Sequence, residues 1–226
     1  MADRPISFSP PMIRALIDGR KTQTRRVLKP RGADLWQHAT TGEWFERHGV
    51  HGSTSSPVKA PYAPGDRLWV REAWRTERAF DAYRPRDLPW IERPDLPIFY
   101  EATPNGDLSP LGNQWGRKRP GRFMPRLASR LTLIVENVRV QRVQEISRDD
   151  AVAEGLHRLK ASGRYVINPG DQYCGVASHD PREVYGWYWD HLNAARGFAW
   201  EASPWVVALT FRVLKRNIDD LERDAA

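Results

Sequence analysis

Asp-Gly-Arg-Lys-Thr-Gln-Thr-Arg-Arg-Val, residues 18–27, follows directly on a segment with the pattern of a short amphipathic helix. Ser9 suits the N-cap of that helix, prolines follow in its first turn, and Gly19 suits the left-handed residue just past its end. Apolar side chains at helical spacing predict that the helix packs against a core: Met12, Ile13, Leu16 and Ile17. The polar residues after Gly19 are therefore expected to leave a fixed helix end.

This polar stretch holds five side chains that suit chemistry: Lys21, Thr22, Thr24, Arg25 and Arg26. A hydroxyl beside a lysine is a pairing that supports nucleophilic attack. An arginine can hold a carbonyl or a phosphate with two parallel hydrogen bonds. Composition alone fits a solvated polar turn equally well, because runs of charge usually face water.

The whole chain has the size and composition of one domain with a substantial core. Its 226 residues include 35 Lys and Arg against 28 Asp and Glu, so the formal net charge of +7 favours anionic partners such as nucleotides or nucleic acid. No apolar run approaches the ~20 residues of a membrane span, and the N-terminus lacks the apolar core of a signal peptide. We expect a cytoplasmic protein with no membrane partner.

Metal and cofactor sites are not expected from the residue types present. The single Cys174 excludes an internal disulfide and cannot build a thiolate zinc site. The six histidines are scattered, and no two form a His-x-x-x-His pair. Gly-x-Gly-x-x-Gly, P-loop and Gly-x-Ser-x-Gly patterns do not occur either.

The order of elements predicts an α+β fold, namely a small mixed barrel with flanking helices and long loop insertions. Alternation and capping signals indicate strands at 67–72, 98–101, 131–143 and 205–214, and helices at 147–156 and 180–195. A change of parity near 136–137 suggests a bulge or bend in a long strand, as in small barrels. We expect a single domain over 1–226, with irregular insertions at about 31–64, 75–122 and 157–180. The first insertion contains Trp36 and Trp44, which would either pack it against the domain or form an aromatic platform for a base.

Glu154 stands out in the predicted helix at 147–156. Ser147 is expected to be the N-cap, with Asp150 three residues later in a near capping box, and Gly155 to be the stop. An acid in the last turn opposes the helix dipole, so its position indicates a role other than helix stability. As an ordinary structural residue, Glu154 would be a helix-end acid that is ion-paired with an arginine.

Three blocks of the sequence resemble the ASCH family, whose members are PUA-like β-barrels. The first is Ile17-Asp18-Gly19-Arg20-Lys21-Thr22-Gln23-Thr24-Arg25-Arg26, similar to the family's Lys-Thr-x-Thr-x-Arg segment. The second is Gly65-Asp66-Arg67-Leu68-Trp69-Val70, similar to its Gly-Asp-x-Leu strand start, and the third is Ala151-Val152-Ala153-Glu154-Gly155, similar to its Ala-x-x-Glu helix. The closing strand near residues 207–212 also fits, and the tryptophan-rich insertions are similar to those of longer ASCH proteins of phages and prophages.

The resemblance implies an amidohydrolase that removes the acyl group from N4-acylated cytosine or cytidine. By that resemblance Lys21, Thr24 and Glu154 are the catalytic residues, the substrate is a small modified nucleobase or nucleoside, and no cofactor takes part. Arg26, Thr22 and Arg25 are then the expected substrate-binding residues. Other ASCH proteins are proposed to bind RNA or reported to be ribonucleases, so the resemblance favours the fold more firmly than the reaction.

Amide hydrolysis needs a nucleophile, a base and a donor for the oxyanion. Thr24 would attack while a neutral Lys21 takes its proton; alternatively Lys21 and Glu154 would activate water, and Thr24 would only position it. A lysine pKa of about 10.4 must fall for this role, which Arg26 favours and Glu154 opposes. In a regular strand Lys21 and Thr24 face opposite sides, so a turn or bulge is expected between them. As ordinary structural residues, Lys21 would be a surface lysine and Thr24 a strand former.

Two other functions fit the same residues. One is a non-catalytic module that binds RNA or single-stranded DNA through the basic clusters at 25–26 and 117–122, with binding that weakens in salt. The other is a metal-independent ribonuclease in which Lys21 stabilises a phosphorane and Glu154 is the base. A closed pocket around Lys21 would fit a single base, whereas an open basic groove would fit a strand.

Overall fold

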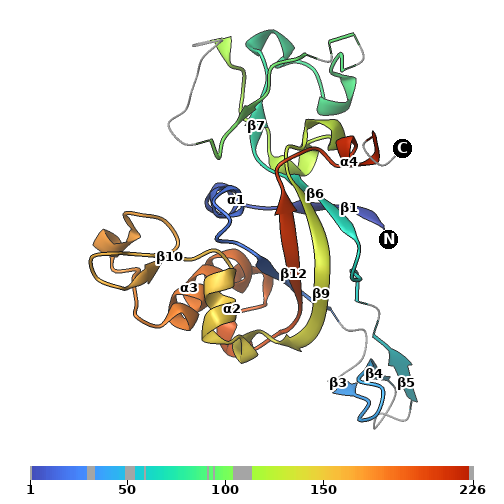
Figure 1. Ribbon diagram of the computed structural model, residues 1–226, viewed down its shortest axis with the longest axis vertical. Helices are drawn as coiled ribbons and strands as arrows, with labels where there is room; N and C mark the ends of the chain where they lie inside the picture. The colour runs from blue at the N-terminus through green and yellow to red at the C-terminus, as the bar shows by residue number, and fades with distance from the viewer. Residues whose placement is uncertain are drawn as a thin grey trace. The chain divides into compact units, whose positions relative to one another are not determined.

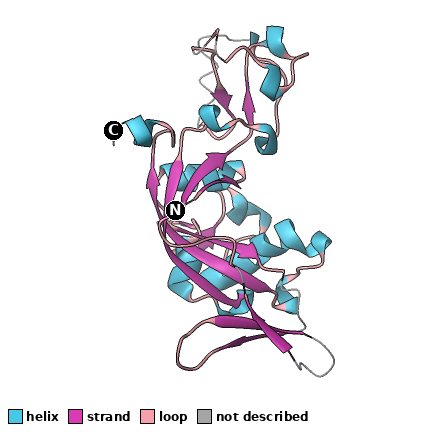
Figure 2. Cartoon of the chain, turned by 90° about the vertical axis from the view of Figure 1, so that its right-hand side faces the viewer, coloured by secondary structure: helices cyan, strands magenta, loops and turns pink. Residues whose placement is uncertain are grey.

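The computed structural model describes residues 2–29, 34–48, 54–58, 60–90, 92–93, 95–103 and 114–223. Within these residues the fold is mixed α+β, as predicted, with strands outnumbering helices (Figures 1 and 2). The strands are β1 (Asp3–Ser7), β2 (Gln23–Val27), β3 (Asp34–Gln37), β4 (Trp44–His48), β5 (Thr54–Pro57), β6 (Arg67–Arg71), β7 (Trp74–Arg75), β8 (Phe99–Tyr100), β9 (Thr132–Arg142), β10 (His157–Arg158), β11 (Tyr165–Val166) and β12 (Trp205–Leu214). The helices are α1 (Pro10–Ile17), α2 (Arg148–Ala153), α3 (Pro181–Asn193) and α4 (Asp220–Arg223).

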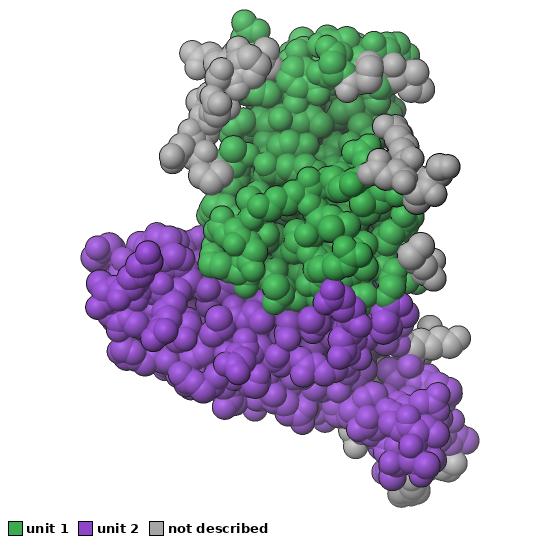
Figure 3. Space-filling model, in the orientation of Figure 1, with its two compact units in different colours: residues 1–22, 65–135, 211–226 green, residues 23–64, 136–210 purple. Residues whose placement is uncertain are grey.

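The described strands form four sheets and no closed barrel, so the barrel stays a prediction. The largest sheet has the order β1-β6-β9-β12-β2, and the smaller ones are β3-β4-β5, β7-β8 and β10-β11. The chain divides into two compact units, coloured separately in Figure 3. Unit 1 comprises residues 1–22, 65–135 and 211–226, and unit 2 comprises residues 23–64 and 136–210.

Unit 1 begins with β1, which pairs in parallel with β6, while β6 pairs antiparallel with the start of β9. Helix α1 follows β1 and matches its prediction: Ser9 is the N-cap residue, a proline occupies the first turn, and Gly19 has φ +74°. Met12, Ile13 and Leu16 are buried. A second cluster of buried apolar side chains lies under the short 3₁₀ turns of residues 78–128: Trp74, Leu88, Leu96, Met124 and Ala128.

Unit 2 contains β2, which pairs antiparallel with β12 in the register Thr24↔Leu209. Helices α2 and α3 lie side by side in Figure 1 and share one apolar core: Val143, Ile146, Ala151, Tyr185, Trp189 and Val206. Both helices start as predicted, because Ser147 accepts a hydrogen bond from the Asp150 N–H and Asp180 accepts one from the Arg182 N–H. The predicted helix and strand positions are therefore largely confirmed, with ends that differ by a few residues.

The stretch at about 31–64 is not irregular where the structure describes it, which corrects that part of the prediction, and its being an insertion stays a prediction. Strands β3, β4 and β5 form an antiparallel sheet there, and residues 31–33, 49–53 and 59 lie outside the described residues. Trp36 stacks on Phe45 with ring centroids 5.0 Å apart, and Trp44 meets Trp205 edge-on at 5.2 Å. Both tryptophans therefore pack within unit 2, the first of the two roles considered for them. The described helices include none that is long and apolar enough to cross a membrane.

Candidate functional site

Strand β2 carries three of the predicted site residues, and its alternation separates them. Thr24 and Arg25 are both buried, and Arg26 is half-buried. Successive side chains of a strand point to opposite faces, so Arg25 lies on the same face as Gln23, and Thr24 on the face of Arg26. The strand therefore presents these side chains to two different environments.

The Arg25 guanidinium bridges two carboxylates of the α2 region. Its Nη1 donates to Glu154 Oε1 at 3.0 Å, and its Nη2 donates to Asp150 Oδ2 at 2.9 Å. Asp150 also accepts hydrogen bonds from Gln23 Nε2 at 2.7 Å and from Arg139 Nη2 at 2.8 Å. The Arg25 side chain is fully buried, so this network fixes the α2 region against β2 with charge-assisted hydrogen bonds.

Glu154 is the C-cap residue of α2 and is only 5% exposed. Its Oε1 accepts the Arg25 hydrogen bond and a second, longer one from the Tyr185 hydroxyl at 3.4 Å. The chain leaves the helix through Gly155, whose φ of +105° is in the left-handed region that favours glycine. The acid that opposes the helix dipole is thus held by an arginine, as expected of an ion-paired helix-end acid, and it is also enclosed.

Burial and charge shift the ionisation of the groups around Glu154. Burial raises the pKa of Tyr185 well above its ordinary value, and the Glu154 carboxylate adds to that effect. Burial lowers the pKa of Arg26, while Tyr62 and Glu154 act in the opposite direction. Partial burial alone would raise the pKa of Asp150, but hydrogen bonds from Arg139 and Gln23 and the charge of Arg25 bring it below its ordinary value. Tyr185 is therefore a neutral hydrogen-bond donor at neutral pH.

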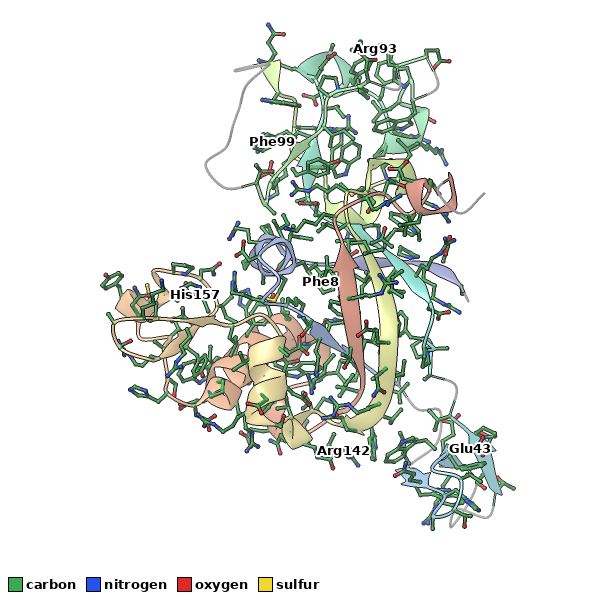
Figure 4. The ribbon with its side chains drawn as sticks, in the orientation of Figure 1. Phe8, Glu43, Arg93, Phe99, Arg142 and His157 are labelled. Carbon is green, nitrogen blue, oxygen red and sulfur yellow. The ribbon has the colours of Figure 1, made fainter. Side chains whose placement is uncertain are left out.

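Lys21 belongs to unit 1 and is not the surface lysine that its residue type favours. It is 1% exposed, its backbone N–H donates to the Ala15 carbonyl at 3.0 Å, and its Nζ lies 5.5 Å from the centroid of the Phe8 ring. Phe8, labelled in Figure 4, lies in the segment between β1 and α1. Strand β2 begins only at Gln23, so Lys21 lies outside the strand that carries Thr24.

The structure brings together some of the predicted residues and not others. Arg25 contacts Glu154 directly, and Arg26 interacts with the same carboxylate through its charge. Thr24 is a buried strand residue, and within the described part of the chain no hydrogen bond involves its hydroxyl. Thr22 is exposed in unit 1. The interactions of unit 2 therefore assemble Arg25, Arg26 and Glu154.

Sequence reasoning missed four members of the network: Gln23, Arg139, Asp150 and Tyr185. Asp150 was expected to close a capping box, but its carboxylate instead accepts hydrogen bonds from Gln23, Arg25 and Arg139. Its spacing of four residues from Glu154 is the signal that places two side chains on one helical face. Tyr185 lies within an aromatic-rich helix, and nothing in the local sequence distinguishes it from its neighbours.

The described residues hold no group of three or more His, Cys, Asp or Glu side chains arranged to bind a metal ion. Comparison of the chain with protein-family models, with curated proteins and with solved structures found no match.

Proposed function

We propose that this chain is an amidohydrolase that removes the acyl group from N4-acylated cytosine or cytidine. The observation that carries the proposal is the environment of Glu154, the acid that the resemblance to ASCH proteins makes catalytic. Its side chain is enclosed and is held by Arg25 at 3.0 Å and by the Tyr185 hydroxyl at 3.4 Å. A carboxylate fixed in this way suits the orienting role that catalysis demands of its supporting groups.

The proposed chemistry divides the reaction into two steps. Thr24 Oγ adds to the acyl carbonyl carbon, and its proton passes to a neutral Lys21 amine. The C–N bond then breaks as Lys21 returns the proton to the leaving cytosine amine, and water hydrolyses the acyl-threonine ester. Burial of Lys21 favours the neutral amine, whereas the Phe8 ring favours the ammonium ion. In the alternative assignment a water molecule attacks, and Thr24 only positions it.

The barrel and the membership of the ASCH family are part of the same proposal. The support for both is the order of α1, the Lys-Thr-x-Thr segment, β6, α2 and β12 along the chain, which follows the order of the resembling blocks.

Incubation with N4-acetylcytidine and N4-acetylcytosine, without added metal, tests the function. The wild-type protein is expected to release cytidine or cytosine, and Lys21→Ala to lose that release. Thr24→Ala and Thr24→Ser distinguish attack by threonine from attack by water. Loss of activity in Thr24→Ala, with activity kept in Thr24→Ser, supports attack by the hydroxyl. A wild-type protein that gains the mass of one acetyl group during the reaction supports the covalent path. No release across several N4-acyl groups contradicts the proposal.

A further inference from the structure

A second candidate site lies in unit 1, in the region predicted as an insertion at about 75–122. A pocket of about 750 Å³ opens between the chain around residues 84–86 and residues 117–125. Its lining is formed by five cationic side chains, one phenylalanine and prolines, and it includes Arg84, Arg86, Arg117, Lys118, Arg119 and Phe123. That volume falls within the range of small-molecule sites in proteins.

The positive charge around this pocket is poorly neutralised by the protein. Arg84 and Arg117 form no ion pair with any described carboxylate, and none of the described residues that line the pocket is acidic. Arg86 pairs with the exposed Asp87 at 3.5 Å, and an exposed pair of this kind contributes little. The exposed Lys118 lies 3.9 Å from Glu101, a half-buried carboxylate that also pairs with Arg75. Both cations are therefore available to a stronger anionic partner.

Arg119 is the buried member of this set. It is 3% exposed, and its guanidinium donates to the backbone carbonyls of Phe80 at 2.7 Å and Tyr83 at 2.9 Å. Its Nε is enclosed and has no hydrogen-bond partner, and no described carboxylate is within ion-pair distance. Burial and the neighbouring Arg117 lower the pKa of Arg119, and Asp81 offsets them only in part.

A buried cation without a carboxylate partner costs folding free energy, and a bound anion would offset that cost. Arginine forks match the oxygen geometry of phosphate, and the exposed Lys118 adds a mobile positive charge. Phe123 is 51% exposed at the same pocket, and the Arg122 guanidinium lies 4.8 Å from its ring centroid. An exposed ring flanked by arginine is the kind of surface on which nucleobases stack.

We propose that this pocket binds a nucleoside phosphate, either as a free nucleotide or as one unit of a single strand. The phosphate lies among Arg84, Arg117 and Arg119, and the base lies on the face of Phe123. The proposal goes beyond the amidohydrolase function and does not depend on it, because every residue that carries it belongs to unit 1 and none has been assigned to catalysis.

Binding to the full chain tests the site, with inorganic phosphate, cytidine, cytidine 5′-monophosphate and a short single-stranded oligonucleotide as separate probes. We expect cytidine 5′-monophosphate or the oligonucleotide to bind more tightly than phosphate or cytidine alone. A mononucleotide that binds as well as the strand identifies a free nucleotide. A strand that binds more tightly, with a steep dependence on salt, identifies nucleic acid.

The test variant is Arg117→Ala/Lys118→Ala, since both side chains are exposed. We expect it to lose about ten-fold in affinity for the probe that the wild-type protein binds, the equivalent of one good charged contact. The matched control is Arg158→Ala/Lys160→Ala, which removes two exposed cations of unit 2 and is expected to change the affinity by less than about two-fold.

Phe123→Ala tests the stacking contact separately from the charge. We expect it to weaken nucleotide binding and to leave phosphate binding unchanged. The proposal is overturned if none of the probes binds, if both double variants lose affinity equally, or if Phe123→Ala leaves nucleotide affinity unchanged. Hydrolysis of N4-acetylcytidine, measured on the same Arg117→Ala/Lys118→Ala protein, is expected to stay at the wild-type rate, so failure of the pocket and failure of the hydrolase are separate results.

Discussion

Arg25 in unit 2 and Arg119 in unit 1 are both buried arginines, but their guanidinium groups have different hydrogen-bond partners. Arg25 bridges two carboxylates, Asp150 and Glu154, at 2.9 and 3.0 Å. The Arg119 guanidinium donates to the carbonyls of Phe80 and Tyr83 and lines a cationic pocket. Carboxylates neutralise the charge of Arg25, whereas the groups that contact the Arg119 guanidinium, two carbonyls and the Trp74 ring at 5.5 Å, carry no net charge.

The largest effects are expected when each of these arginines is replaced by methionine, a long side chain without charge. Arg25→Met leaves Asp150 and Glu154 without their shared partner, and breaking a buried ion pair costs about 3–5 kcal/mol. Arg119→Met leaves two backbone carbonyls without a donor, which costs about 1–3 kcal/mol. Urea unfolding of the two variants measures both free energies, and equal losses would remove the distinction between the two arginines.

Adding a ligand tests the proposed binding of an anion in the pocket that Arg119 lines. If the Arg119 pocket takes a nucleoside phosphate, a ligand concentration of 100 Kd stabilises the protein by about 2.7 kcal/mol. Thermal unfolding with and without cytidine 5′-monophosphate reads out this shift. The shift should persist in Arg158→Ala/Lys160→Ala and shrink in Arg117→Ala/Lys118→Ala; a shift of equal size in both would place the binding elsewhere.

Much of the secondary structure could be predicted because its signals are local. The Ser147 cap, the Asp180-Pro181 helix start and Gly19 with its positive φ are each set by neighbouring residues, and the structure confirms them. Strand β1 could not be predicted, because Asp3, Arg4 and Pro5 have low strand propensity and pair with β6 more than 60 residues away.

The candidate sites were harder to predict than the helices and strands, because contacts between residues far apart in the sequence form them. Glu154 was found from its misplaced charge and from the resemblance, but its partner Arg25 comes from a strand 129 residues away. The burial of Lys21 has no local signal, since a lysine after a helix end is usually solvated. The basic cluster at 117–122 was visible in the sequence, whereas the contribution of residues 84–86 required the fold.

A smaller effect is expected from the hydroxyl that contacts Glu154. Tyr185→Phe removes a donor at 3.4 Å and keeps the ring that packs in the core, so we expect a loss of about 1 kcal/mol in the free energy of unfolding. If Tyr185 helps to orient Glu154, the rate of hydrolysis falls in the same variant. Tyr173→Phe, which alters an exposed tyrosine of unit 2, is the control.

The smallest effect is the acid dependence that Asp150 contributes to stability. Its pKa is lowered in the folded protein, so the carboxylate contributes stability above the unfolded value of about 3.9. That contribution is lost as the pH falls through the lower folded value. Asp150→Asn should therefore be less stable than the wild type at neutral pH, and the two should converge in acid; a constant difference at every pH would contradict the assignment.

The most direct test of the account is the release of acetate from N4-acetylcytidine by the wild type, by Glu154→Gln and by Glu183→Gln. Glu183 is an exposed acid of α3, so its amide variant controls for the loss of one negative charge. We expect the wild type and Glu183→Gln to hydrolyse the substrate at similar rates, and folded Glu154→Gln to be slower by about 10²-fold, the effect of a misoriented catalytic group. A Glu154→Gln protein that hydrolyses the substrate as fast as the wild type would show that this buried acid serves the structure alone.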